Sequence, residues 1–279
     1  MCGRYVMALR AGDLADALDA DLLDGLQLKE SWNIAPTTPV PIVVDRGSER
    51  REIHLARWGL LPGWARDRAF SSRTFNARSE TVLSKPAFRS AVRRRRCGVP
   101  AQGYYEWQTI TDPETGKESK RPHVVQPADG SLMLFAGLYE WWQDPALLAA
   151  GDAAPWVLST TILTGAAPEQ ASPGSSSLSS SSPETARVAQ ESGVADQGGV
   201  LSQLAQLHDR MPLAMTEETA ARWMRPADLS RDEAEALVMT VREEADAVAC
   251  TWTITEVGTA VGNVRNDSPE LTAPVEKLF

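Results

Sequence analysis

Cysteine and histidine are scarce in this chain of 279 residues, and neither type is clustered. The residues are Cys2, Cys97, Cys250, His54, His123 and His208. Three scattered cysteines exclude a disulfide framework and a CxxC metal motif, and the histidines lack the spacing of metal ligands. We therefore expect no metal and no cofactor.

The sequence also lacks the hydrophobic segments that direct proteins to membranes. No run of about 18 apolar residues is present, so a membrane-spanning helix is not expected. The first residues, MCGRYVMALRAGDLADALDADL, become acidic where a signal peptide would have its apolar region. We expect a cytoplasmic protein without a membrane partner.

Positive charge is scarce overall but concentrated in one segment. The net charge is −9, yet residues 51–97 contain twelve Arg or Lys against three Asp or Glu. Such a segment in an acidic protein predicts a surface for an anionic ligand. For the run RRRR at 93–96, a solvated turn before a strand is an equal alternative.

The hydrophobic pattern mixes helices and strands without regular alternation. Leu and Ala at helical spacing predict a helix over 11–25, and residues 76–88 predict a short helix interrupted at Pro86. Further helices are expected at 216–226, with Thr216 as its cap, and at 230–245. Strand composition is found at 40–44, 97–107, 123–126, 132–142 and 156–163. This order predicts an α+β fold with mixed or antiparallel sheets.

One segment has the composition of a disordered chain. Residues 165–202 are rich in Ser, Gly, Pro and Ala and contain almost no large apolar side chain. Such a segment cannot bury enough surface to offset the entropy of ordering it. Because core-like sequence resumes at LAQLHDRMP, we expect one domain over 1–279 with a disordered insertion at about 165–202.

Cys2 stands where a thiol could become the amino terminus. Methionine aminopeptidases remove Met1 before a small side chain, which would leave an α-amine and a thiol on one residue. The amine has a reference pKa of about 8, and the thiolate is a strong nucleophile. Together they condense with an aldehyde, through a Schiff base, to a thiazolidine. The alternative is a cysteine that packs inertly as a small hydrophobe.

Four polar residues are candidates for proton transfer or ligand binding. Glu106 in GYYEW and Glu140 in GLYEWW have aromatic neighbours that can raise a carboxyl pKa, although both glutamates could also point outward from strands. His208 in LHDRMP could act as an acid or base, or cap a helix. Asn76 could be a helix cap or bind a ligand through its amide.

Taken together, the motifs resemble those of the SOS response-associated peptidase (SRAP) family, whose members shield abasic sites. The ordered motifs are MCGRY (1–5), WNIAP (32–36), RWGLLPGW (57–64), NARSET (76–81), GYYEW (103–107), AGLYEWW (136–142), HDRMP (208–212) and AVGNVRND (260–267). They cover nearly the whole chain except the Ser-rich segment.

The resemblance implies a single SRAP-like domain whose sheets form a barrel-like core with flanking helices. It implies a lyase-like activity in which the processed terminal cysteine crosslinks the aldehyde of an abasic site in single-stranded DNA. Removal of Met1 would be autocatalytic or by an aminopeptidase. The expected protein is a monomer that associates with the nucleoid upon DNA damage, with replication-fork proteins as further candidate partners.

The resemblance also assigns roles to residues. Cys2 is the nucleophile, Asn76 positions it, Glu106 moves protons and His208 assists, whereas Glu140 is structural. DNA contacts are expected from Arg4, Asn33, Pro36, Trp64, Arg78, Lys85, Arg89, Thr164 and Arg210. Phosphates would pair with the cations, and bases would stack on the aromatic ring.

Two other functions use the same residues. A cysteine peptidase or N-terminal-nucleophile hydrolase would use Cys2 with Glu106 and His208 to cleave a peptide, including its own leader. A single-strand binding module would use the basic residues without chemistry. The Ser-rich segment separates Thr164 from His208, where relatives have a short connection, so the local geometry of the site depends on how the insertion is accommodated.

Overall fold

The computed structural model describes residues 2–23, 25–47, 50–168 and 197–275. Its strands are β1 (Tyr5–Met7), β2 (Ala20–Leu22), β3 (Ser31–Ile34), β4 (Pro39–Val44), β5 (Arg51–Trp58), β6 (Asn76–Arg78), β7 (Arg96–Ala101), β8 (Gly103–Thr111), β9 (Glu118–Pro127), β10 (Met133–Gln143), β11 (Trp156–Ala166), β12 (Arg210–Pro212) and β13 (Trp252–Glu256). Its α-helices are α1 (Ala11–Ala17), α2 (Ala91–Arg94), α3 (Pro145–Ala149), α5 (Gln197–Leu207), α6 (Glu217–Met224) and α7 (Arg231–Ala249). This mixture confirms the predicted α+β class.

The larger sheet closes on itself. Its eight strands include the path β11-β10-β7-β4-β5, and β5 pairs again with β11 in parallel through Arg57 and Trp58. Closure removes the exposed edges of these strands and surrounds much of the main apolar core. The barrel-like core implied by the family resemblance is therefore confirmed.

The smaller sheet has the order β13-β9-β8-β1-β3 and joins the barrel directly. β7 belongs to the barrel and β8 to the smaller sheet, so the chain changes sheets at Gln102. A side chain on Gly103 would lie 2.5 Å from Gln126 Cγ and 2.8 Å from the Val125 carbonyl oxygen. Glycine therefore permits the close approach of β8 and β9 directly after the crossing.

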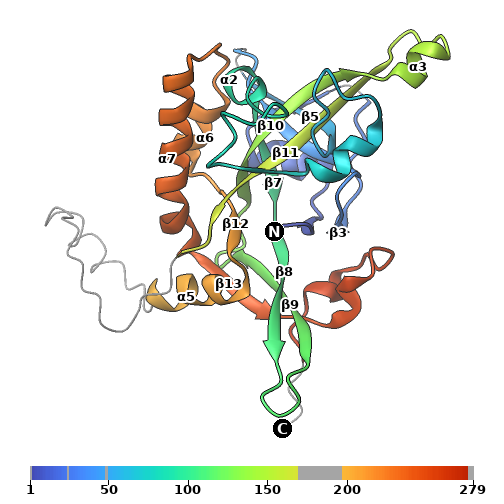
Figure 1. Cartoon of the computed structure of the whole chain (residues 1–279). Helices are drawn as coiled ribbons and strands as arrows, with labels where there is room; N and C mark the ends of the chain where they lie inside the picture. The colour runs from blue at the N-terminus through green and yellow to red at the C-terminus, as the bar shows by residue number, and fades with distance from the viewer. Residues whose placement is uncertain (1, 24, 48–49, 169–196, 276–279) are drawn as a thin grey trace, which may run out of the picture.

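Helices cover one side of this arrangement, with α6 and α7 side by side (Figure 1). Thr216 caps α6, which confirms the predicted cap, and Ser230 forms a capping box with Glu233 at the start of α7. In the part of the chain that the structure describes, no helix is sufficiently long and apolar to cross a membrane.

The helix predicted over 11–25 is wrong in its second half. α1 ends at Ala17, and Asp19 then adopts a positive φ of 43°. The chain continues as β2, which pairs in parallel with β5. A strand pairing with a distant segment thus overrides the local helical spacing.

The short helix predicted within 76–88 is also wrong. Residues 76–78 form β6, which pairs in parallel with β11, and turns follow as far as α2. Asn76 is therefore a strand residue and not a helix cap. The pairing fixes Asn76 opposite Ile162 in the barrel wall.

The interior of the Ser-rich segment, residues 169–196, lies outside the described residues, so its predicted disorder stays a prediction. At its two ends, β11 continues to Ala166 and α5 begins at Gln197, so regular structure extends into the expected insertion. β12 returns to pair with β11, placing Pro212 opposite Thr164, and the Ala167 N–H donates to the Asp209 carbonyl at 2.9 Å. The chain before and after the segment is therefore joined by this ladder.

The run at 93–96 is not a simple solvated turn. Arg93 and Arg94 end α2, and Arg95 Nη2 lies 2.6 Å from Glu140 Oε2, which gives Glu140 the structural role expected of it. Arg96 is only 4% exposed, and its guanidinium donates to the carbonyls of Trp223 and Arg225 at 2.8 and 2.7 Å. Part of the basic segment therefore stabilises the fold.

We expect Arg96→Met to lower the free energy of unfolding by about 3 kcal/mol, because several buried carbonyls lose their donor. Chemical denaturation monitored by tryptophan fluorescence would measure the change. Arg94→Met removes an exposed guanidinium two residues earlier and should leave stability nearly unchanged. Equal stability of the two variants would contradict the structural role of Arg96.

Candidate active site

Cys2 lies three residues before the start of β1, a strand of the smaller sheet. Its side chain is fully buried in the main core. Burial, and secondly the negative charge of Glu106, raise the pKa of the Cys2 thiol well above its ordinary value of 9.0. The thiol is therefore protonated at neutral pH, and a reaction at sulfur needs a nearby group to accept its proton.

Asn76 holds the backbone of Cys2 from the barrel side. Its Nδ2 donates to the Cys2 carbonyl oxygen at 2.7 Å. Because β6 is fixed against β11, this hydrogen bond anchors the start of the chain to the barrel wall. The structure thus brings together two of the residues that the motifs predicted.

Glu106 approaches from the smaller sheet. It lies on β8, and its side chain is buried on the strand face opposite Tyr105. Burial raises the pKa of the Glu106 carboxyl above its ordinary value of 4.5, although the nearby charge of His208 acts in the opposite direction. The outward orientation considered from the sequence is wrong, and a buried carboxyl with a raised pKa suits proton exchange near neutral pH.

His208 lies in the connection between α5 and β12. Its Nε2 is 3.9 Å from Glu106 Oε1, a distance that a bridging water could span. The Arg210 N–H lies 3.0 Å from Nδ1, and the Asp209 carboxylate lies 2.5 Å from the same atom. The first contact suits a neutral ring that accepts at Nδ1, and the second suits a protonated ring. His208 is therefore placed to exchange protons with Glu106.

Arg210 is held firmly beside His208. Its guanidinium binds both carboxylate oxygens of Glu80, at 2.8 and 2.9 Å, and the Thr164 carbonyl at 2.7 Å. Thr164 is fully buried, so it contributes by holding Arg210 and has no surface for a ligand of its own. Arg210 could reach a phosphate only by sharing or leaving Glu80.

Arg4 and Asn33 connect the site to the C-terminal motif. Arg4 Nη1 donates to Asn33 Oδ1 at 2.8 Å and to the Val261 carbonyl at 2.9 Å, and its guanidinium lies over the Trp107 ring. Asn33 Nδ2 donates to the Asn266 carbonyl at 2.7 Å. Asn33 is buried, so it shapes this loop, whereas Arg4 is half-buried with part of its guanidinium already occupied.

The remaining predicted contacts lie nearer the surface. Pro36 and Asn33 help to line a cavity of about 720 Å³ between the WNIAP loop and the C-terminal motif. Trp64 is 57% exposed and packs edge-on against Phe70. The exposed cations of this group are Arg78, Lys85 and Arg89. The structure does not bring all of these residues to Cys2. A long polyanion does not require this, because it extends beyond the site.

Several buried polar atoms in the site motifs have no protein partner among the residues that the structure describes. They are Arg4 Nε, Tyr5 Oη, Asn76 Oδ1, Ser79 Oγ and Arg210 Nε. An unsatisfied buried polar group costs about 1–3 kcal/mol, so solvent or a ligand should satisfy these atoms. Their concentration in the predicted motifs supports a ligand site here.

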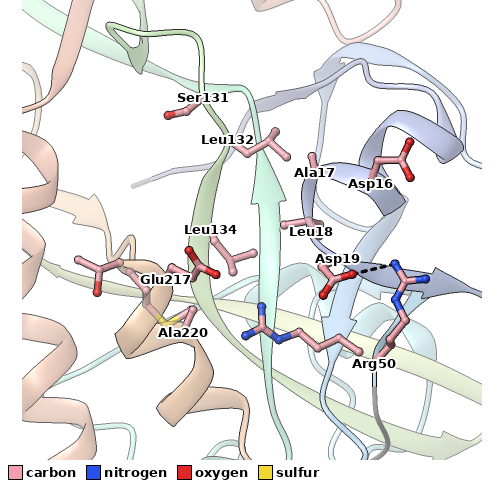
Figure 2. A pocket seen from close by; sticks show the side chains of 13 residues that line it. Asp16, Ala17, Leu18, Asp19, Arg50, Ser131, Leu132, Leu134, Glu217 and Ala220 are labelled. Atoms are coloured by element: carbon pink, nitrogen blue, oxygen red, sulfur yellow. Dashed lines mark ion pairs between the residues drawn. The ribbon is translucent and has the colours of Figure 1, made fainter.

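A separate cavity of about 640 Å³ lies between α1, α6 and the β9–β10 connection (Figure 2). The ion pair of Arg50 and Asp19, 3.0 Å apart, lies at this cavity, and its other lining includes Leu132 and Leu134. None of the described residues that line it is a predicted site residue. Among the same described residues, no group of three or more His, Cys, Asp or Glu is arranged to hold a metal.

The sequence motifs and this geometry agree with a family comparison. A sequence model described as SOS response associated peptidase (SRAP) matches residues 1–173, which is more than half of the chain. The chain belongs to the SRAP family.

Relatives along the full length of this SRAP chain share one kind of name. "Abasic site processing protein YoqW" of Bacillus subtilis is 28% identical over 97% of this chain and 98% of its own length. "Abasic site processing protein YedK" of Escherichia coli is 27% identical over 99% and 100%. "Abasic site processing protein HMCES" of Gallus gallus is 25% identical over 99% and 78%.

Solved structures support the same fold. A Bacteroides thetaiotaomicron protein superposes with a TM-score of 0.66 at 20% identity and covers 99% of this SRAP chain and 100% of its own. A Bordetella bronchiseptica protein reaches a TM-score of 0.59 at 20% identity, over 92% and 100%. At this identity the likeness concerns the fold alone.

Sequence reasoning missed three supporting residues of this SRAP site. Glu80 binds Arg210, Asp267 accepts the Trp32 N–H at 2.7 Å, and the Tyr5 hydroxyl is buried near Cys2. Each of them lies inside a recognised motif, in NARSET, AVGNVRND and MCGRY respectively. Their place in the motifs was a signal, but their partners are too distant in sequence to be identified without a structure.

Proposed function

We propose that this protein senses abasic sites in single-stranded DNA and shields them through a covalent thiazolidine crosslink to Cys2. The observation that carries the proposal is the convergence of Cys2, Asn76, Glu106 and His208 from separate elements at one buried position. The names of the full-length relatives, all abasic site processing proteins, support the same substrate.

The chemistry requires that Cys2 be the amino-terminal residue, so Met1 must be removed. The α-amine of Cys2 attacks the aldehyde carbon of the ring-opened sugar and forms a carbinolamine. Loss of water gives a Schiff base, and the thiol then adds to the imine carbon while its proton passes to the imine nitrogen. One water is released overall, and no oxidant or reductant is needed.

Glu106 and His208 supply the proton transfers of this sequence. A carboxylate accepts a proton from the attacking amine, and the resulting carboxylic acid protonates the departing hydroxyl. His208 can relay protons between Glu106 and the surface, because it is partly exposed and faces Glu106. Asn76 keeps the amine and thiol of Cys2 in place, so less entropy is lost in the reaction.

The raised pKa of the Cys2 thiol favours this scheme over peptide hydrolysis. A cysteine peptidase attacks with a thiolate, whose pKa such enzymes lower with a positive neighbour. Here burial and the charge of Glu106 raise the pKa of the thiol, and the positive amino terminus offsets them only in part. Attack by the amine first, followed by closure of a neutral thiol with proton transfer, fits this environment better.

DNA would cross the site along its polar and basic rim. Arg78 and, more distantly, Lys85 and Arg89 would pair with phosphates, and the exposed Trp64 would stack on a base next to the lesion. Arg4 and Arg210 would contact phosphate by sharing guanidinium groups that in this structure bind Asn33 and Glu80. Pro36 and Asn33 would shape the adjoining cavity. We infer a cytoplasmic monomer that joins the nucleoid when DNA is damaged, with replication-fork proteins as further partners.

The direct test incubates the protein with a single-stranded oligonucleotide that carries one abasic site. A denaturant-resistant adduct is expected with this DNA and none with an undamaged control. Intact mass spectrometry should show protein without Met1 and an adduct heavier by the DNA less one water. Peptide cleavage without any adduct would overturn the proposal in favour of a peptidase.

We expect Asn76→Leu to slow adduct formation about fivefold at saturating DNA. One hydrogen bond to Cys2 is lost, worth about 1 kcal/mol, in a side chain of similar size. Rates should be read from adduct accumulation on denaturing gels, with affinity measured separately by anisotropy. Arg78→Gln, in the same strand, should weaken binding and leave the saturated rate intact. Equal effects on affinity in both variants would contradict the positioning role of Asn76.

A further inference from the structure

A second basic feature lies away from Cys2, at the junction of α2 and the start of α7, which pack together (Figure 1). It is a pocket of about 240 Å³, which we call the arginine pocket. Its lining consists of Leu83, Arg89, Ser90, Arg93, Arg94 and Arg231. The proposed crosslinking chemistry makes no use of this pocket.

The positive charge of the arginine pocket is only partly balanced. Asp228 lies 2.9 Å from Arg94 Nη2 and 3.7 Å from Arg93 Nη2, so one carboxylate serves two guanidinium groups. Arg89 and Arg231 have no carboxylate partner among the residues that the structure describes, and no described lining residue is acidic. Four cations held together in an acidic protein therefore retain an excess of positive charge.

This arrangement suits a phosphate oxyanion. Guanidinium groups bind phosphate through paired N–H donors, and an anion between several of them relieves their mutual repulsion. Arg93 Nε donates to the Leu229 carbonyl at 2.6 Å, which holds that side chain in place. The Ser90 hydroxyl adds a neutral donor at the same pocket. Arg89, Ser90, Arg94 and Arg231 are exposed and Arg93 is partly exposed, as a ligand that arrives from solvent requires.

The place of the arginine pocket along the chain indicates the source of the phosphate that it binds. β6 carries Asn76, which holds Cys2, and the exposed Arg78. The chain then runs through exposed Lys85 and Arg89 to α2 and the pocket. These cations follow one another along the chain from the strand that holds Cys2 to the pocket, whereas the residues outside 51–97 carry a net negative charge.

We propose that the arginine pocket binds a backbone phosphate of the DNA strand that flanks the abasic site. The inference rests on the proposed function, because it assigns the flanking part of the same substrate. It gives Arg89 a defined place and adds Arg93, Arg94 and Arg231 to the DNA interface. The contact carries no base specificity, as suits a protein whose target is a missing base.

Arg94→Gln/Arg231→Gln tests the pocket with two exposed residues to which the proposed function assigns no contact. Arg94 pairs with the exposed Asp228, and Arg231 has no carboxylate partner among the described residues. Affinities for fluorescent single strands with an abasic site would be measured by anisotropy at several salt concentrations. One strand would have short flanks and the others would be extended on the 5′ or 3′ side. For the wild type, one extension should raise affinity and steepen the dependence on salt.

The double variant should lose this gain. On the extended strand its slope of log affinity against log salt should fall by about 1.4, the value for two phosphate contacts to a single strand. Its affinity for the short strand and its adduct yield should be unchanged. Arg10→Gln/Arg121→Gln removes the same charge from exposed positions elsewhere and should retain the gain.

Three results would overturn the inference. The double variant could keep the wild-type slope on every strand, or it could lose affinity equally for short and extended strands. It could also bind every DNA strand as the wild type does and lose affinity only for polyglutamate, tested as a second polyanion. That result would identify an acidic protein partner instead of DNA. Failure of wild-type protein to bind or crosslink any abasic strand would instead overturn the proposed function, so the two failures are distinguishable.

Discussion

Cys2→Ala is expected to abolish the covalent adduct with abasic single-stranded DNA, and Cys2→Ser should form no thiazolidine. Alanine keeps the α-amine but has no thiol to close the ring, so only a reversible Schiff base can form. The serine hydroxyl is a poorer nucleophile at neutral pH. Denaturing gels would show the loss, and borohydride should trap the Schiff base of the alanine variant at its amino terminus.

Cys250→Ala provides the matched control for this experiment. Cys250 lies at the C-terminal end of α7, away from the site, and burial raises the pKa of its thiol as well. It should give the wild-type adduct yield, and non-covalent DNA affinity should be similar in all the variants. If Cys2→Ala still forms a stable adduct without borohydride treatment, the thiazolidine assignment is wrong.

Features that depend on neighbouring residues could be predicted from the sequence. The predicted cap of α6 was correct because the Thr216 hydroxyl and the N–H group that it accepts from lie within one turn. Alternation along β8 placed Tyr105 and Trp107 on the face opposite Glu106, and both aromatic rings pack in a separate cluster. Ordered motifs identified the family because they preserve these local patterns over the whole chain.

Features that depend on distant residues could not be predicted. α1 ends early because β2 pairs with β5, and β6 exists because β11 lies beside it. The alternation of side chains along β8 predicted which face of the strand carries Glu106. It could not predict that Glu106 is buried, because its burial depends on the junction between the smaller sheet and the barrel. The Glu80–Arg210 pair joins residues separated by 130 positions, and both are charged residues with many conceivable partners.

Glu106→Gln is expected to slow adduct formation about 100-fold, the typical contribution of a positioned acid or base. Glutamine keeps the size and polarity of the side chain but cannot exchange a proton. Because burial raises the pKa of Glu106, the wild-type rate should increase with pH through a value above 4.5, and this limb should disappear in the variant. Single-turnover rates across pH would measure both effects, and the reversal of isolated adduct should slow in parallel.

The repeated motif supplies the control, because Glu140 is also flanked by aromatic residues in a strand but is paired with Arg95. Glu140→Gln should reduce stability by leaving Arg95 without its carboxylate and should leave the rate and pH profile unchanged.

For Glu106→Gln the change in stability has the opposite sign. A raised pKa in the folded state means that ionisation opposes folding, so wild-type stability relative to Glu106→Gln should fall as pH rises from 4.5. A Glu106→Gln protein that reacts at the wild-type rate but binds DNA weakly would reassign Glu106 to a structural role.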